Sequence, residues 1–192
     1  DQWKGSPIKW QFRFRNQKQN KYTIGLQLEK DAGEGFQTLP DYLAGYVLLE
    51  QPVRFIHKLI LGDFRVNWGQ GLVLFQGFQG FGGFVDHNRG PGSLTVHTGM
   101  DEYLFFRGLS LESNLKPRLN TQFFISHRRL DATFEEDGAS IWAKNIKKDG
   151  LHRTQSELEK KGMLSANLGG LQFNFSEGKF RTGLQGLYNH FS

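Results

Sequence analysis

The sequence predicts an all-β protein: an antiparallel, up-and-down β-barrel of the outer-membrane type, or part of one, with a short helical insert near residues 154–161. Two observations lead to this fold class. Most of the chain alternates apolar and polar residues over strand-length segments that end at polar or glycine-rich turns. Several segments approach the roughly 9–11 residues that a tilted strand needs to cross a bilayer, and aromatic residues stand near their ends. A soluble β-sandwich or barrel with an aromatic core is the alternative that the same pattern allows.

The first four strands follow from strict alternation and from turn residues. Residues 8–15 place Ile, Trp and Phe on one face and Lys, Gln and Arg on the other, and residues 22–29 repeat the pattern after a polar turn. The two segments therefore predict an antiparallel hairpin. Residues 41–50 and 53–60 predict two further strands, with Pro52 as the boundary between them because proline interrupts a strand ladder.

The remaining strands are shorter or interrupted. They are expected over residues 59–68, where the strand over 53–60 continues, and over 103–111, 119–127, 141–146, 171–175 and 179–191, which brings the count to about eight or nine. Gly62 and Asp63 interrupt the first of them and indicate a bulge or bend. The aromatic residues expected in interfacial girdles are Trp10, Tyr22, Tyr42, Tyr46, Trp68, Tyr103 and Tyr188.

The helical insert is predicted from a capping box. Thr154 is followed three residues later by Glu157, so the threonine hydroxyl can accept from the glutamate N–H while the carboxylate bonds back. Good helix formers continue over residues 157–161. We expect a short, polar and exposed helix between strands.

The segment from Gly62 to Phe84 combines glycines with regularly spaced phenylalanines. Gly69-Gln70-Gly71 begins like a dinucleotide fingerprint, but Leu74 stands where the third glycine belongs, and no Gly-Lys-Ser/Thr of a phosphate-binding loop follows. Close packing is the physical interpretation, because glycine lets the backbone bend or approach another backbone. The segment is therefore expected to fold inward as a constriction or to lie across the sheet, with its phenylalanines facing lipid or plugging the interior.

The composition excludes several classes of protein. The chain has 192 residues and no cysteine, so disulfides, cysteine-bound zinc and thiol nucleophiles are absent. An aromatic content of 14% argues against disorder, and no apolar run approaches the ~18 residues of a membrane-spanning helix. The net charge of +5 is spread along the chain, and the basic stretch 9–21 fits the polar face of a hairpin. We interpret residues 1–192 as a single segment of a longer chain.

No spacing of residues points to catalysis or to a metal. Asp101 and Glu102 are adjacent, so on a strand they face opposite ways, and a salt bridge to Arg107 or a charge that faces the lumen is the expected use of these residues. His87 and His97 flank a Gly/Pro loop, but without the spacing of a zinc motif. We expect no catalytic, cofactor-binding or metal-binding residues. We do not expect this segment to bind nucleic acid. Alternation places the arginines of residues 9–15 and the aromatic rings on opposite faces, whereas a base-stacking surface needs them together.

Three runs, LGDFRVNWGQGLVLFQGF (61–78), DEYLFFRGLSL (101–111) and DGLHRTQSELEKKG (149–162), occur in this order. In them the chain resembles large outer-membrane β-barrel proteins of Bacteroidota, in which a signal peptide and helix-hairpin-helix segments precede the barrel. The resemblance covers roughly a quarter of the chain directly. It implies residence in the outer membrane of a Gram-negative bacterium, with outer-membrane lipid and other envelope proteins as partners. This sequence shows neither the signal nor the helix-hairpin-helix region, which a fragment would explain.

The leading functional hypothesis is a barrel segment that acts as a pore, a transport element or an assembly scaffold without catalysis. The residues expected to form its structural motif are Gly62, Asp63, Gly69, Gln70, Gly71, Arg107, Gly108, Thr154 and Glu157. One alternative is a soluble β domain that binds carbohydrate or another ligand through exposed aromatic side chains. A second is an envelope protein that handles DNA through a helix-hairpin-helix region outside these residues. A third is an enzyme, such as a hydrolase, that uses Asp101, Glu102 or histidine residues.

Overall fold

The computed structural model describes residues 3–35, 42–69, 74, 93–137, 140–148 and 150–192. They form an antiparallel sheet of nine strands: β1 (Trp10–Lys18), β2 (Tyr22–Lys30), β3 (Tyr42–Val53), β4 (Ile56–Asn67), β5 (Ser93–Val96), β6 (Phe106–Lys116), β7 (Leu119–Leu130), β10 (Leu164–Glu177) and β11 (Phe180–Phe191). A separate hairpin pairs β8 (Ala132–Asp137) with β9 (Ser140–Ile146). The all-β, antiparallel prediction is therefore confirmed.

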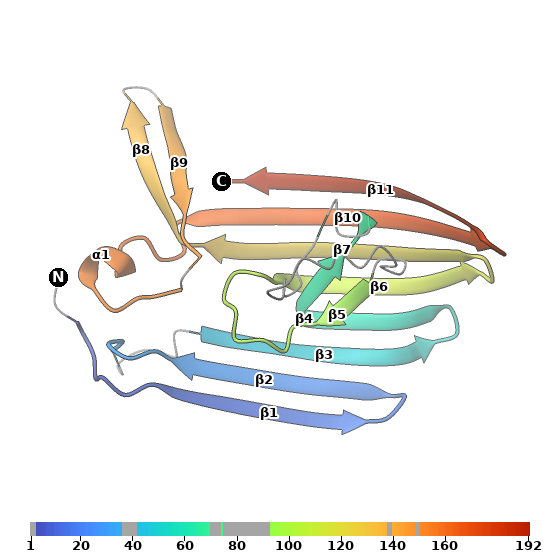
Figure 1. The fold of residues 1–192 in the computed structure, drawn as a ribbon, viewed down its shortest axis with the longest axis horizontal. Coiled ribbons are helices and arrows are strands. Elements are labelled where there is room, and N and C mark those ends of the chain that lie inside the picture. Colours follow the sequence, from blue (N-terminus) through green and yellow to red (C-terminus); the bar gives the residue numbers. More distant parts are fainter. Residues whose placement is uncertain (1–2, 36–41, 70–73, 75–92, 138–139, 149) are drawn as a thin grey trace.

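The strand order is an up-and-down meander, β1-β2-β3-β4-β6-β7-β10-β11, with β5 paired to the end of β4 (Figure 1). Each pair of neighbours is antiparallel. Within the described residues the sheet is open, with β1 and β11 at its two edges.

The two ends of the sheet differ in their connections. At one end, two or three residues join β1 to β2, β3 to β4, β6 to β7 and β10 to β11. At the other end, β2 leads to β3 and β7 leads to β10 through longer connections, and the connection after β7 includes the β8–β9 hairpin and a helix (Figure 1). We call these the tight-turn end and the long-connection end.

The two faces of the sheet differ: β5 and the end of β4 pack on one, which we call the inner face, and the opposite one is the outer face. The outer face carries rows of apolar side chains. The register aligns Leu49, Leu59, Leu111, Phe123 and Leu171 in one row across β3, β4, β6, β7 and β10. A neighbouring row on the same face joins Val47, Leu61, Leu109 and Ile125. Because successive strand residues point to opposite faces, these rows form a continuous band of aliphatic and aromatic side chains on one face.

The inner face carries polar side chains at the same level of the sheet. One residue along from the first apolar row, the register aligns Glu50, Lys58, Glu112, Gln122, Gln172 and Gln185 across six strands. Gln122 and Gln172 are fully buried. Polar side chains thus face inward where apolar side chains face outward.

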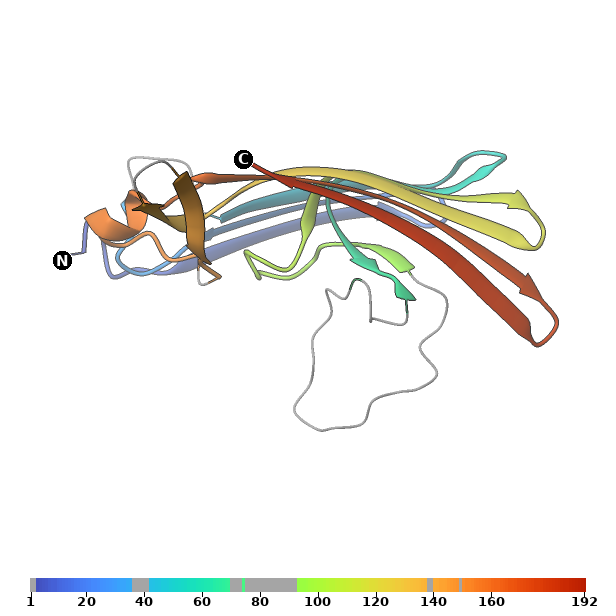
Figure 2. The same ribbon diagram turned by 90° about the horizontal axis from the view of Figure 1, so that it is seen from above.

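The hydrophobic core lies against the inner face, where part of the chain folds beneath the sheet. Figure 2 shows the end of β4 and the whole of β5 under the other strands. Phe64, Val66 and Trp68 from this segment, with Leu94 of β5, pack on inner-face residues of the sheet such as Phe124. The rings of Trp68 and Phe124 meet edge to face with centroids 5.1 Å apart.

The helical insert is present as α1 (Gln155–Leu158), so it begins and ends earlier than the expected 157–161. Its capping box forms as predicted, because the Glu157 N–H donates to Thr154 Oγ1 and the Glu157 carboxylate accepts from the Thr154 N–H. The described part of the chain holds no helix with the length and apolar character that crossing a lipid bilayer requires.

Two sequence expectations about the strands are wrong. Pro52 lies inside β3, and the chain turns at residues 54–55, because the register shifts between Glu50 and Val53 and accommodates the proline. β5 and β8 were not expected. Each is only four to six residues long, which is too short for alternation to stand out from the background.

The expected aromatic girdles are also partly wrong. Tyr42, Tyr46 and Trp68 are buried in the interior, so they are not placed to face lipid. Tyr42 and Tyr46 share the inward-facing positions of β3, and Trp68 lies beneath the sheet beyond the end of β4. Tyr188, by contrast, is 66% exposed.

Candidate functional site

The inward turn of β4 begins at Gly62, which is the last residue of β4 paired with β3. β4 then stays with β6 as far as Phe64 and pairs with β5 from Phe64 to Asn67. Gly62 has φ +97°, and a Cβ there would lie 2.2 Å from the carbonyl oxygen of Gly45 in β3. The departure of β4 therefore needs a residue without a side chain at this position.

Asp63 and Arg107 bridge the place where β4 leaves β3. Arg107 donates from Nε to Asp63 Oδ1 at 2.6 Å and from Nη2 to Asp63 Oδ2 at 3.0 Å. The same two side chains reach β3, because Asp63 Oδ2 accepts from the Gly45 N–H at 2.7 Å and Arg107 Nη2 donates to the Leu43 carbonyl at 2.5 Å. Side chains thus hold β3 to β6 at the level where the backbone ladder between β3 and β4 has ended.

The structure brings four residues of the expected structural motif together. The segment Gly62-Asp63-Phe64 lies antiparallel to Phe106-Arg107-Gly108, so that glycine faces glycine, acid faces base and ring faces ring. Gly108 also permits close approach, since a Cβ there would be 2.3 Å from the Ile125 carbonyl oxygen. The expected pairing of Arg107 with Asp101 or Glu102 is wrong.

Asp101 and Glu102 have other contacts. Asp101 Oδ1 accepts from the backbone N–H groups of Tyr103 and Leu104, which closes a turn. The Glu102 carboxylate lies against Gly150, where an added Cβ would come within 2.0 Å of Oε2. These two carboxylates therefore stabilise the loop before β6. The ion pair with Arg107 is made by Asp63 of β4.

Three further members of the expected motif lie elsewhere. Gly69 follows the end of β4 with φ +61°, and Thr154 and Glu157 form the cap of α1. Gln70 and Gly71 lie outside the described residues, as do Phe75, Phe78, Phe81 and Phe84.

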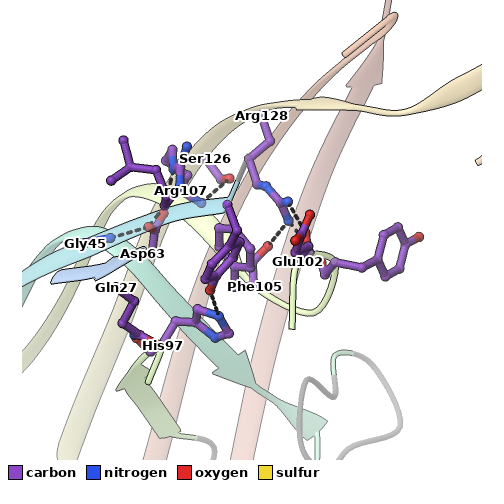
Figure 3. A network of polar contacts seen from close by, with 12 residues as sticks. Gln27, Gly45, Asp63, His97, Glu102, Phe105, Arg107, Ser126 and Arg128 are labelled. Carbon is purple, nitrogen blue, oxygen red and sulfur yellow. Dashed lines mark hydrogen bonds and ion pairs between the residues drawn. The ribbon is translucent and has the colours of Figure 1, made fainter. Parts of the chain in front are cut away.

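A stack of side chains lies next to the bridge, on the inner side of the sheet (Figure 3). The His97 imidazole stacks on the Phe105 ring with centroids 4.5 Å apart. The Arg128 guanidinium lies 3.7 Å from the centroid of the same ring and donates to the carbonyls of Glu102, Tyr103 and Phe105. Arg128 therefore fixes the loop before β6 through three backbone acceptors and one aromatic face.

His97 is buried in a neutral form whose tautomer follows from its partners. Arg65 Nε donates to His97 Nδ1 at 3.1 Å, so Nδ1 carries no proton. His97 Nε2 lies 2.8 Å from the Tyr42 hydroxyl, and that hydroxyl also donates to the Gly99 carbonyl. The imidazole therefore donates from Nε2 to Tyr42. Burial first, and then the charge of Arg65, lower the pKa of His97 to about 4.

Acidification is expected to destabilise the folded chain through His97, which follows β5 and lies in none of the strands. Its folded pKa of about 4 is below the ordinary value of 6.5, so the unfolded chain binds more protons between these values. The free energy of unfolding should then fall as the pH drops from about 6.5 to 4, by up to ~3 kcal/mol. Nearby Arg65 and Arg128 strengthen the effect and Asp101 weakens it. Equilibrium unfolding across this range tests the prediction, and the same loss in His97→Gln would contradict it.

Sequence reasoning missed the stack as a unit. Arg128 and Tyr42 carried no motif, and His97 was weighed only as half of a metal pair with His87, which lies outside the described residues. Alternation along β7 could have placed Arg128 on the inner face, because it lies two and four residues after Ser126 and Phe124, which face inward. No cluster of three or more potential metal ligands occurs among the residues that the structure describes.

No protein-family model matches this chain, and no curated protein or solved structure matches it either.

Proposed function

We propose that this chain is a segment of an outer-membrane β-barrel that acts as a pore, a transport element or an assembly scaffold, without catalysis. The observation that carries the proposal is the inverted polarity of the sheet at the level of the polar row that includes Gln122 and Gln172. Ile125 on the outer face is 51% exposed, while Gln122 and Gln172 on the inner face are 2% and 1% exposed. A sheet in water buries its apolar face; a barrel wall in lipid turns it outward.

The buried polar groups support a hydrated interior. Gln27 Oε1, Ser110 Oγ and Gln172 Oε1 have no hydrogen-bond partner among the described residues. A buried amide or hydroxyl without a hydrogen-bond partner costs roughly 1–3 kcal/mol. These groups are therefore more stable if the interior contains water that can bind them than if it is dry.

The segment beneath the sheet narrows that interior. β5 and the end of β4 are held to the inner face by the core around Trp68 and by the hydrogen bond from Trp68 Nε1 to Gln122 at 2.7 Å. A strand that folds inward from the wall and packs on polar and aromatic inner residues is suited to constrict a passage. This is the part of the molecule that we assign to control of a solute's path.

The open edges and the connections support the same placement. In lipid, unpaired backbone groups each cost several kcal/mol, so β1 and β11 require further strand partners within a closed wall. Outer-membrane barrels have short turns on the periplasmic side and long loops outside. The tight-turn end is therefore assigned to the periplasm and the long-connection end to the exterior.

Cell fractionation with a gel-shift assay tests the proposal. The protein should be recovered in the outer-membrane fraction, and its migration on a gel should differ between heated and unheated samples, as for a folded barrel. Recovery in the soluble fraction with heat-independent migration would contradict the proposal and favour the soluble ligand-binding alternative.

The outer face offers a sharper test through one substitution. Ile125→Arg places a charge in the apolar band and is expected to lower stability in a bilayer by ~2–4 kcal/mol near the midplane. Gln19→Arg, in the exposed turn between β1 and β2, adds the same charge at the sheet end and should change stability by less than ~0.5 kcal/mol. Unfolding measured in lipid vesicles compares them. Equal stability of the two variants would show that the outer face does not meet lipid.

A further inference from the structure

A cavity of about 390 Å³ opens at the long-connection end of the sheet. Its walls come from the start of β3, the loop before β6, the end of β7 and residues 147–148, 150, 152 and 161–162. It is lined by six basic side chains, Arg107, Arg128, Arg129, Lys147, Lys148 and Lys161, and by two carboxylates, Glu102 and Asp131. We call it the cationic pocket.

The charges of the cationic pocket do not balance within the described residues. Arg107 is neutralised by Asp63. Asp131 already accepts from His152 Nε2 at 2.7 Å and from the Gly162 N–H at 2.7 Å. Arg129 and Lys147 form no ion pair with any residue in the described ranges. The pocket therefore has an excess of positive charge in a concave space.

Part of this charge is held rigidly. Arg128 is fixed by three carbonyls and by the Phe105 ring, and Lys148 Nζ lies 5.1 Å from the centroid of the Tyr103 ring. Like charges gathered in a cleft repel one another and raise the local concentration of counter-ions. A bound anion would relieve this repulsion.

We infer that the cationic pocket binds a phosphoryl group. Its basic side chains come from four separate segments: β6, the end of β7, the residues after β9 and the residues after α1. Converging cations from several directions suit the terminal oxygens of a tetrahedral phosphate better than a planar carboxylate, which favours one bidentate arginine. The volume lies within the ~300–1,000 Å³ that small-molecule sites occupy, so a phosphate monoester fits.

Two sources could supply the phosphoryl group: a phosphorylated lipid head group or a soluble phosphate ester. The lipid source rests on the proposed function, because it requires the long-connection end to lie at the outer leaflet. The binding of phosphate itself does not depend on the membrane placement. Titration of the folded chain therefore tests the pocket, and the fractionation above tests the location.

The experiment uses the full chain folded in detergent micelles and calorimetric titration with inorganic phosphate at constant ionic strength. The test variant is the double substitution Arg129→Gln/Lys147→Gln, which removes two charges that lack ion-pair partners. The matched control, Lys18→Gln/Lys179→Gln, removes two charges at the tight-turn end. We expect saturable binding that weakens at least ~10-fold in the test variant and changes less than ~2-fold in the control.

Two competitors then distinguish the sources: glucose 1-phosphate and nanodiscs of phosphatidylcholine with lipid A. Displacement of bound phosphate by either competitor supports the site and identifies the source. Absence of saturable phosphate binding to wild-type chain that shows the folded gel shift would overturn the inference. Equal weakening in the test and control variants would also overturn it, because binding would then reflect net charge alone.

Discussion

Replacing Gly62 with alanine is expected to prevent β4 from leaving the sheet and to destabilise the fold by about 3 kcal/mol or more. Two effects add at this position. The backbone has φ +97°, which L-residues rarely adopt, and the new Cβ would lie 2.2 Å from the Gly45 carbonyl oxygen. The Gly45 carbonyl oxygen belongs to the backbone of the neighbouring strand, so it cannot change rotamer to avoid the new Cβ as a flexible side chain could.

A second glycine separates the two effects. Gly178 has φ +58° in the turn between β10 and β11, but a Cβ there meets nothing within 4 Å. Gly178→Ala should therefore cost only ~1–2 kcal/mol from the backbone conformation. Gly62→Asn, which tolerates positive φ, should be no better than Gly62→Ala, because the collision remains. Unfolding in detergent micelles and the gel shift measure these differences, and equal costs at the two glycines would refute the close-approach argument.

Replacing Arg107 with leucine is expected to lower the free energy of unfolding by ~3 kcal/mol, because it leaves a buried carboxylate without its cation. Asp63 is 1% exposed, and its remaining partner would be the Gly45 N–H. The Leu43 carbonyl would lose its donor as well. Arg107→Lys retains the charge but not the bidentate hydrogen bonds to Asp63, so an intermediate loss in the free energy of unfolding is expected.

The reverse substitution should be milder. Asp63→Asn preserves the shape, and the Arg107 side chain is 46% exposed, so its charge can turn to water. A loss of ~1–2 kcal/mol is expected. The double variant Asp63→Asn/Arg107→Leu should be less destabilised than the sum of the single variants, because no charge is then left buried. Denaturant unfolding of all variants in one detergent measures the coupling, and strict additivity would show that the two side chains do not act as a pair.

Much of the sheet could be predicted from the sequence because alternation is a local property. The hairpin of β1 and β2 and the pair of β6 and β7 lie close to their expected ranges, since each strand alternates apolar and polar residues along the sequence. The capping box of α1 was likewise visible, because its residues are neighbours in the chain. The prediction that Pro52 ends a strand was wrong, because a register shift in β3 accommodates the proline. No local sequence pattern indicates such a shift.

The candidate site was only partly predictable, because its contacts join distant segments. Gly62, Asp63, Arg107 and Gly108 were singled out one by one, yet the partner of Arg107 was expected nearby in the chain. The mirrored order of Gly62-Asp63-Phe64 and Phe106-Arg107-Gly108 was a usable signal for antiparallel pairing. No comparable signal linked His97 to Tyr42, which lies 55 residues away.

The amino-acid sequence is enough to establish the all-β class, the alternation that gives the sheet two unlike faces, and the glycine at which β4 bends. These follow from side-chain period and backbone sterics, which act over a few residues. The folded structure is needed to show which face holds the segment beneath the sheet, which acid pairs with Arg107, and that six basic side chains share one pocket. Those outcomes depend on strand register and on chain reversals, and a change of one residue in register would bring different side chains together.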